Sequence, residues 1–382
     1  MDFPALDVDA FAHAWTGRND GDGDGHRRWW QAVEPWPGTP ETGAARPPQP
    51  ERPTTEPPHA EQPACPAVIL GFRSDEGVRR NHGRRGAASA PAEIRSALGS
   101  LAFHAKRPVY DAGDIVVGVE PDNGRHAGGE PDGGHAGAEA NSGDDAGVEP
   151  ESSGVVGDAK AGGPAGDALA AGQRRAGAAI TALLDAGALP VVFGGGHETA
   201  FASYLGVSAS KRIRDGARLG VLNLDAHFDL RNAPVPSSGT PFLQMAHAEA
   251  AAGRTLNYAV VGISEPNNTR ALFDTADRLD VKYLPDEECT EDRTREFVES
   301  FLATVDAVYL TIDLDVMPAS VAPGVSAPAA FGVPLPVIVA ICGQVAASGK
   351  LFHADLAELN PDFDVDSRTA MVAARLVHTL LR

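Results

Sequence analysis

The stretch Leu219-Gly-Val-Leu-Asn-Leu-Asp-Ala-His-Phe-Asp229 decides what fold and chemistry we expect. Its first six residues are uncharged and mostly apolar, which is typical of a strand covered on both faces of a sheet. The residues that follow alternate, and positions i, i+2 and i+4 of an extended segment point the same way. We therefore expect Asp225, His227 and Asp229 to face one cavity at the end of this strand.

Two other apolar runs end in the same manner. Residues 189–193 run into Gly194-Gly-Gly-His197-Glu198, and residues 307–312 run into Asp313-Leu-Asp315. In a parallel sheet the carboxyl ends of the strands lie along one edge, where α/β proteins bind their ligands. The sequence thus places six polar side chains at one rim: His197, Asp225, His227, Asp229, Asp313 and Asp315.

Four carboxylates this close together repel one another, and two divalent cations would cancel their charge. Mixed carboxylate and imidazole ligands suit Mn, Fe, Co or Zn. Two such metals can share a water molecule, lower its pKa and hold a hydroxide at neutral pH. Taken singly, Gly-Gly-Gly-His is more often a tight turn, and Asp-x-Asp is common in turns and caps. Their joint occurrence at three strand ends favours a two-metal hydrolytic centre.

The rest of the chain alternates short apolar runs with helical patterns, which predicts a three-layer α/β/α sandwich with a mainly parallel sheet. We expect strands at 67–72, 189–193, 219–224, 257–263, 281–284, 307–312 and 351–356. We expect helices near 91–99, 167–187, 198–207, 241–252, 267–278, 291–304, 334–348 and 367–381.

Two stretches are poor in large apolar side chains, and we expect both to be mobile. One is Pro-rich (about 36–64), and the other is a low-complexity insertion (about 118–165) built from small and acidic residues. The expected organisation is an N-terminal segment (1–66) that contains the linker, followed by a single catalytic domain (67–382). The insertion interrupts that domain as a disordered surface loop.

The composition of the chain indicates which kinds of molecule it can bind. The 382 residues include 32 Lys+Arg against 52 Asp+Glu, a formal net charge of -20, which disfavours nucleic acid and membrane surfaces as partners. The cysteines at 65, 289 and 342 are far apart and fit neither a disulfide framework nor a cysteine zinc site. There is no apparent leader or long apolar run, so we expect a cytoplasmic protein that acts on a small molecule.

The sequence resembles the arginase/agmatinase superfamily, the ureohydrolases, which use a dimanganese centre on an α/β/α fold. The motifs that carry this resemblance are Gly194 to Glu198, Asp225 to Asp229, and Asp313-Leu-Asp-Val-Met-Pro318 followed by Ala322-Pro-Gly324. Three further stretches are similar to the branch that hydrolyses N-formimidoyl-L-glutamate: Trp15-Thr-Gly-Arg-Asn-Asp20, Ser74-Asp-Glu-Gly-Val-Arg-Arg-Asn-His-Gly-Arg84, and residues 223–231.

The resemblance implies two Mn²⁺ per subunit and a homo-oligomer. One metal would be bound by His197, Asp225, Asp229 and Asp313, and the other by Asp225, His227, Asp313 and Asp315, with Asp225 and Asp313 bridging. Glu358 falls where the family places the carboxylate that holds a cationic amidino group, and an amidine is protonated at neutral pH. Glu358, Asp229 and the metal-bound water are the candidates to protonate the leaving nitrogen.

The activity implied is hydrolysis of N-formimidoyl-L-glutamate to L-glutamate and formamide in histidine degradation, through a dimanganese-bound hydroxide. The substrate's two carboxylates call for arginine, whose planar fork pairs with them. Arg231 is the first candidate. Thr240 and the loop arginines Arg79, Arg80 and Arg84 are also substrate-binding candidates, although the loop arginines could equally be solvated partners of an acidic surface.

Two other functions stay open. An agmatinase or another hydrolase of guanidino compounds would release urea, and a catalytically silent relative would bind metal only. Arginine itself is disfavoured as a substrate, because Phe242 occupies the position at which arginases carry a histidine thought to shuttle protons.

Overall fold

The structure is a computed structural model that describes residues 3–9, 15–21, 23–38, 65–118 and 167–382. These residues form one nine-stranded sheet, and every neighbouring pair of strands is parallel. The strand order is β1-β3-β2-β4-β9-β8-β5-β6-β7. The strands are β1 (Glu34–Pro35), β2 (Ala67–Arg73), β3 (Val109–Val116), β4 (Leu189–Phe193), β5 (Leu219–Leu224), β6 (Asn257–Ile263), β7 (Lys282–Pro285), β8 (Ala307–Asp313) and β9 (Leu351–Ala357).

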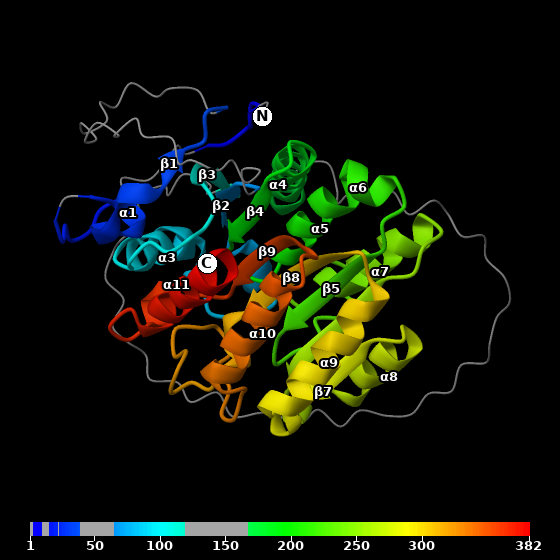
Figure 1. Cartoon of the computed structure of the whole chain (residues 1–382). Helices are drawn as coiled ribbons and strands as arrows, with labels where there is room; N and C mark the ends of the chain where they lie inside the picture. Colours follow the sequence, from blue (N-terminus) through cyan, green and yellow to red (C-terminus); the bar gives the residue numbers. More distant parts are fainter. Residues whose placement is uncertain (1–2, 10–14, 22, 39–64, 119–166) are drawn as a thin grey trace, which may run out of the picture.

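Helices cover both faces of this sheet (Figure 1). One layer contains α1 (Trp29–Ala32), α3 (Ala90–Gly99), α9 (Glu291–Thr304), α10 (Leu335–Ala347) and α11 (Arg368–Leu381), whose apolar side chains share one core cluster. The opposite core cluster contains side chains of α4 (Ala168–Asp185), α5 (Thr199–Ala209), α6 (Lys211–Arg214), α7 (Pro241–Ala251) and α8 (Arg270–Arg278). The short α2 (Glu76–Arg80) follows β2.

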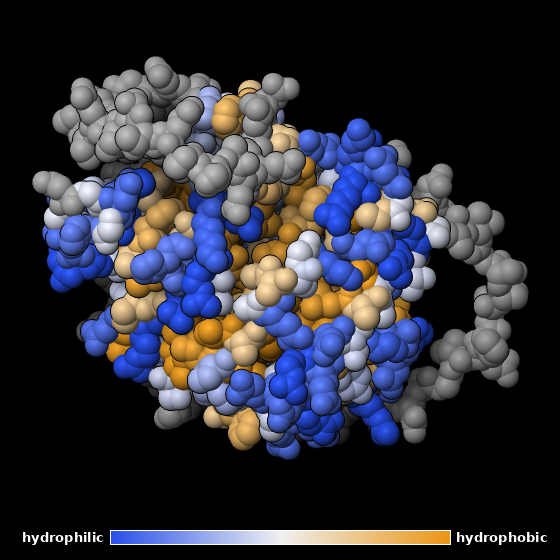
Figure 2. All heavy atoms as spheres, viewed as in Figure 1, coloured by the Kyte–Doolittle hydropathy of each residue, from blue (hydrophilic) through white to orange (hydrophobic). Residues whose placement is uncertain are grey.

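The central strands are buried along their whole length, since both faces are covered. Every residue of β4, β5 and β8 is buried, as expected for parallel strands that read as continuous apolar runs. In the view of Figure 1 the outer surface is largely hydrophilic, and hydrophobic atoms are visible between the helices (Figure 2). The predicted three-layer α/β/α sandwich with a parallel sheet is confirmed.

Every strand and helix predicted from the sequence is present, although the ends of some differ by one to three residues. The prediction did not include β1, β3, α1, α2 and α6. The longest of these, β3, reads Val109-Tyr-Asp-Ala-Gly-Asp-Ile-Val116, and its two aspartates hide its apolar pattern. Both pair in the core with Arg95 of α3, which lies 2.9 Å from Asp111 and 2.7 Å from Asp114.

The expected insertion (about 118–165) lies outside the described residues apart from Gly118, and so does the expected linker from residue 39 to 64. Trp36 is described and is almost completely buried. Its ring lies 5.6 Å from that of Tyr110, and β1 pairs with β3. The N-terminal segment therefore contributes to the same sheet. None of the helices in the described part of the chain has the length and hydropathy of a membrane span.

Candidate metal centre

The predicted ligands meet at the carboxyl ends of four strands that are adjacent in the sheet, β4, β9, β8 and β5. His197 follows β4, Asp225 to Asp229 follow β5, and Asp313 is the last residue of β8. The chain leaves β4 for β5 and returns only later to form β8 and β9 between them. This jump in strand order is where α/β sheets open a crevice for ligands.

The first group of side chains surrounds one nitrogen of His197. Its Nδ1 lies 3.0 Å from Oδ2 of Asp229, 3.2 Å from Oδ2 of Asp225 and 3.2 Å from Oδ2 of Asp313. His197, Asp225 and Asp313 are buried, and the Asp229 side chain is 12% exposed. The geometry brings together the four residues predicted for one metal.

The second group surrounds Nδ1 of His227, which lies 3.1 Å from Oδ2 of Asp315 and 3.5 Å from Oδ1 of Asp225. Asp225 therefore presents one oxygen to each histidine, as a bridging carboxylate must. Asp313 differs, because in the described residues it contacts His197 alone of the two histidines, through Oδ2, while its Oδ1 accepts the backbone N–H of Asp315 at 2.9 Å. A bridging role for Asp313 stays a prediction.

The donor set fits divalent cations. Metal–ligand bonds of about 2.0–2.2 Å place neighbouring ligand atoms about 3 Å apart, which matches the separations of 3.0–3.2 Å around His197. Both three-residue subsets, His197/Asp225/Asp313 and Asp225/His227/Asp315, have ligand atoms within 4.8 Å of one another. Oδ1 of Asp315 is buried and has no hydrogen-bond partner among the described residues, which suits an atom meant for a cation.

Electrostatics point the same way. Burial raises the pKa of Asp229 and raises that of Asp313 well above its usual range, and neighbouring aspartates add to both effects. Burial alone would lower the pKa of both histidines, yet the carboxylates around them raise it well above the usual value. Burial also opposes ionisation of Asp225, but the two histidines lower its pKa overall. The cluster therefore has a strong affinity for positive charge.

Backbone geometry and hydrogen bonds fix these ligands. Asp229 and Glu358 have φ of 48° and 68°, in the left-handed region that non-glycine residues rarely adopt. Such strain tends to persist where function requires a particular side-chain direction. Asp225 Oδ2 accepts a hydrogen bond from Asn223 Nδ2 at 2.9 Å, and its Oδ1 accepts the backbone N–H of His227 at 2.6 Å.

Sequence reasoning missed two polar residues that support the ligands. Asn223 and Thr311 each lie inside an otherwise apolar strand, two residues before Asp225 and Asp313 respectively. Both are completely buried. The period of two along a strand puts them on the same face as the ligand that follows. A polar residue at position i−2 of a predicted ligand was therefore the signal that could have found them.

Glu358 lies beside the ligands, at the end of β9. Its Oε1 accepts the backbone N–H of His197 at 2.8 Å. Burial raises the pKa of Glu358 to about 8, and the nearby Glu198 adds to the shift. Glu198, which sequence reasoning did not assign, accepts hydrogen bonds from Ser74 Oγ at 2.7 Å and from the N–H of Gly77 at 2.8 Å. It links the loop before α2 to the His197 backbone.

The arginines predicted to bind substrate have different surroundings. Arg231 is exposed and donates to Oδ1 of Asn81 at 2.7 Å. Arg79 pairs with Glu76 at 2.6 Å. Arg80 lies between Glu76 at 2.8 Å and Asp167 at 2.7 Å.

Arg84 donates to the carbonyls of Ser326 and Val325, and its guanidinium lies 3.9 Å from the centre of the Phe363 ring. Arg80 and Arg84 thus join distant segments of the chain. Among the four predicted arginines, Arg79 and Arg80 pair with carboxylates, whereas the guanidinium groups of Arg84 and Arg231 contact neutral partners in the described residues.

Thr240 and Phe242 occupy the loop and first turn that lead into α7. Thr240 is buried, and its hydroxyl accepts the backbone N–H of Ser237 at 3.0 Å and lies within donating distance of two oxygens, the Ser237 carbonyl at 3.0 Å and Gln244 Oε1 of α7 at 2.9 Å. The Phe242 ring is fully buried, lies 5.4 Å from the His197 ring and stacks on Tyr258 at 4.4 Å. A phenyl ring at this position cannot carry a proton.

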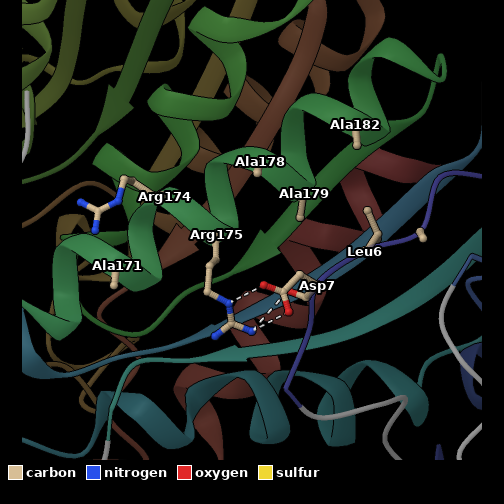
Figure 3. A pocket seen from close by; sticks show the side chains of 9 residues that line it. Leu6, Asp7, Ala171, Arg174, Arg175, Ala178, Ala179 and Ala182 are labelled. Carbon is tan, nitrogen blue, oxygen red and sulfur yellow. Dashed lines mark hydrogen bonds and ion pairs between the residues drawn. The ribbon is translucent and has the colours of Figure 1, made fainter.

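A separate hollow of about 480 Å³ lies between Ala5–Asp7 and α4, on a part of the surface that contains none of the predicted ligands (Figure 3). Its lining is largely alanine, and Arg175 in that lining pairs with Asp7 at 2.9 Å and with Asp9 at 2.8 Å. None of the residues that line it belongs to the site predicted from the sequence.

Comparison with known proteins agrees with this geometry. Residues 65–382 match the model of the Arginase family. The chain is 48% identical over 370 residues to a formimidoylglutamase of Nocardia farcinica, covering 97% of this chain and 96% of that protein. It is 41% identical over 373 residues to one of Chromobacterium violaceum, covering 96% and 97% respectively.

Solved structures with a similar fold include formimidoylglutamase from Bacillus subtilis, with a TM-score of 0.63 and 20% identity over 85% of this chain and 88% of that one. Another is Trypanosoma cruzi formiminoglutamase with Mn²⁺, with a TM-score of 0.63 and 22% identity over 83% of this chain and 93% of that one. The matched family model spans most of the chain, including every predicted ligand. The chain therefore belongs to the Arginase family.

Proposed function

We propose that this protein hydrolyses N-formimidoyl-L-glutamate to L-glutamate and formamide, a step of histidine degradation. One observation carries the proposal: the carboxylate and histidine clusters around His197 and His227 lie at the same rim of the sheet as Glu358. Oε1 of Glu358 is 2.8 Å from the backbone nitrogen of His197. Relatives named formimidoylglutamase, 40–48% identical over nearly the full chain, support the choice of substrate.

The proposed cofactor is a pair of Mn²⁺ ions. His197, Asp225, Asp229 and Asp313 would hold one, and Asp225, His227, Asp313 and Asp315 the other. When bound, the two ions would supply Lewis acidity and lower the pKa of water at the site, so that no serine or cysteine nucleophile is needed. The Trypanosoma cruzi formiminoglutamase of similar fold was solved with Mn²⁺, which supports this identity of the metal.

The chain's own residues position the substrate. An amidine is protonated at neutral pH. Its positive charge would favour the ionised form of Glu358, against the burial that raises the pKa of this group, and the resulting carboxylate would hold the amidinium through charge-assisted hydrogen bonds. Arg231, two residues beyond Asp229, would pair with a carboxylate of the glutamate part. Held at both ends, the substrate would present its formimidoyl carbon in one orientation.

Bond cleavage needs a proton on the leaving nitrogen. Asp229 and Glu358 are the candidates, because each places a carboxyl group at the rim, Asp229 at 3.0 Å from Nδ1 of His197 and Glu358 at 2.8 Å from its backbone nitrogen. The side chain of Phe242 beside His197 has no titratable group to take part. We also propose that the protein is a homo-oligomer located in the cytoplasm. Its partners would be small molecules, with no nucleic acid or membrane.

The test is an assay of purified Mn²⁺-loaded protein with N-formimidoyl-L-glutamate, agmatine and other guanidino compounds. Formamide and glutamate from the first substrate, without urea from the others, is the expected result. Urea release would assign the protein to guanidino hydrolysis instead. Two equivalents of metal with no turnover of any substrate would indicate a silent relative.

A further inference from the structure

We propose that Thr311 and Asp355 are positioning residues that orient His197 and thereby set the affinity of one side of the centre for Mn²⁺. This inference rests on the proposed metal centre, but it does not depend on which substrate the protein hydrolyses. Neither residue belongs to the predicted ligand set.

The first step concerns the two ring nitrogens of His197. Nδ1 faces three carboxylate oxygens at 3.0–3.2 Å, whereas Nε2 lies 3.0 Å from Oγ1 of Thr311. A neutral imidazole that offers the lone pair of Nδ1 to a cation carries its proton on Nε2. That N–H is buried with the ring, and the Thr311 hydroxyl is the acceptor placed to receive it.

The second step concerns what lies behind Thr311. Thr311 of β8 is directly opposite Asp355 of β9 in the register of the two strands. Asp355 is completely buried, and its Oδ2 accepts a hydrogen bond from the hydroxyl of Tyr309. Burial raises the pKa of Asp355. Its Oδ1 is buried and has no hydrogen-bond partner among the described residues. An unpartnered carboxylate oxygen on the neighbouring strand can attract the hydrogen of the Thr311 hydroxyl, which leaves the Thr311 oxygen to accept from His197.

The third step is energetic. A histidine that ligates a metal is oriented by the partner of its other nitrogen, and loss of such a partner typically weakens metal binding by about 10- to 100-fold. His227 provides an internal comparison, because it belongs to the other side of the centre, with Asp315. Disruption of the Thr311 contact should therefore weaken one of the two Mn²⁺ sites and spare the other.

The experiment is a titration of metal-free full-length protein with Mn²⁺, in which free Mn²⁺ is followed by its electron paramagnetic resonance signal. Thr311→Val removes the hydroxyl at constant shape, and we expect one of two binding steps to weaken by about 10- to 100-fold. Thr311→Ser keeps the hydroxyl and should bind both ions within about three-fold of the wild type, since the hydrogen bond is retained. Asp355→Asn should weaken the same step.

Two outcomes would overturn the proposal. One is folded Thr311→Val protein that binds both ions as the wild type does. The other is a lower melting temperature of the metal-free variant with unchanged Mn²⁺ affinity, which would mean that Thr311 acts only in packing. If Thr311→Val does not fold, the Asp355→Asn variant provides the test. Wild-type Mn²⁺ affinity at both binding steps in that variant would reject a positioning role for Asp355 and Thr311. None of these measurements depends on turnover. A wrong substrate assignment can therefore be distinguished from a wrong role for Thr311 and Asp355.

Discussion

Glu358 holds His197 through the backbone, because its Oε1 accepts the His197 N–H at 2.8 Å. The N–H of Glu358 in turn donates to the carbonyl of Gly195 at 2.8 Å. This pair of contacts joins the ends of β9 and β4, so the carboxylate expected to face the amidinium is fixed relative to a predicted metal ligand. Substrate orientation and ligand geometry are therefore coupled in one local structure.

The first prediction concerns the charge of Glu358. Glu358→Gln keeps an oxygen that can accept from His197 but removes the negative charge opposite the amidinium. A hydrogen bond to a charged group contributes about 1.5–3 kcal/mol, so kcat/KM should fall by about 10- to 100-fold or more while Mn²⁺ content stays unchanged. Steady-state kinetics and elemental analysis check both halves.

Glu249→Gln is the matched control, because Glu249 is a buried carboxylate that pairs with Arg254 at 2.6 Å, away from the predicted ligands. Its kcat/KM should stay within about two-fold of the wild type. An unchanged kcat/KM in Glu358→Gln would remove Glu358 from the substrate site.

The second prediction concerns Asp225, whose carboxylate contacts both histidines. Asp225→Asn leaves the shape of the side chain but removes a charge shared by two sites, so Mn²⁺ content should fall below one ion per chain. Because the metal pair contributes several kcal/mol to stabilising the transition state, activity should fall by about 10³-fold or more.

Asp286→Asn serves as the comparison for Asp225→Asn. Asp286 is also buried, yet its Oδ1 only accepts the backbone N–H of Glu287, at 2.8 Å. This variant should retain two ions per chain. Full activity or normal metal content in Asp225→Asn would contradict the proposed centre.

The third prediction separates the arginines. Arg231→Ala removes a guanidinium expected to bind a carboxylate remote from the reacting carbon, so KM should rise by about 10- to 100-fold with kcat within a few-fold. Arg231→Lys should recover only part of this loss, since lysine lacks the planar fork.

Arg79→Ala provides a basic-loop comparison, because Arg79 is exposed and already pairs with Glu76. If KM rises in Arg79→Ala and not in Arg231→Ala, the substrate carboxylate is bound by the loop that contains Arg79 instead of by Arg231. Kinetics with N-formimidoyl-L-glutamate distinguish the two arrangements.

Much of this architecture was readable from sequence because the information is local. Apolar runs mark β4, β5 and β8, and a period of two after them brings Asp225 and His227 to one side. What escaped the sequence depends on partners far along the chain. The aspartates of β3 pair with Arg95 of α3, and Thr311 lies opposite Asp355 of another strand. The loop arginines likewise have partners that the sequence spacing does not predict, such as Asp167 for Arg80.

The fourth prediction tests the pairing that stabilises β3. The side chains of Arg95, Asp111 and Asp114 are at most 3% exposed. Arg95→Met removes the cation that faces both carboxylates and should lower the free energy of unfolding by about 3–5 kcal/mol. Arg218→Met breaks an exposed pair with Asp306 and should cost at most about 1 kcal/mol. Equal effects of the two variants in urea denaturation would show that burial of the pair is immaterial.

The fifth prediction concerns pH and the buried His353 of β9. Burial lowers the pKa of His353 to about 3, against the small opposing effect of the Pro190 carbonyl. In the unfolded chain a histidine has a pKa of about 6.5. Between these values the unfolded state binds a proton that the folded state does not, so stability falls as pH decreases through this window. From pH 7.5 to pH 5 the loss due to His353 should be about 2 kcal/mol.

His353→Leu should remove this part of the pH dependence, whatever its uniform effect on stability. Urea denaturation in EDTA at several pH values measures it, because chelation eliminates the contribution of metal release by the protonated ligands. His247→Leu, at an exposed position of α7, controls for loss of a histidine as such. If His353→Leu and the wild type lose stability in parallel between pH 7.5 and pH 5, the buried ring is not the group responsible, and the acid sensitivity of the fold lies in other residues.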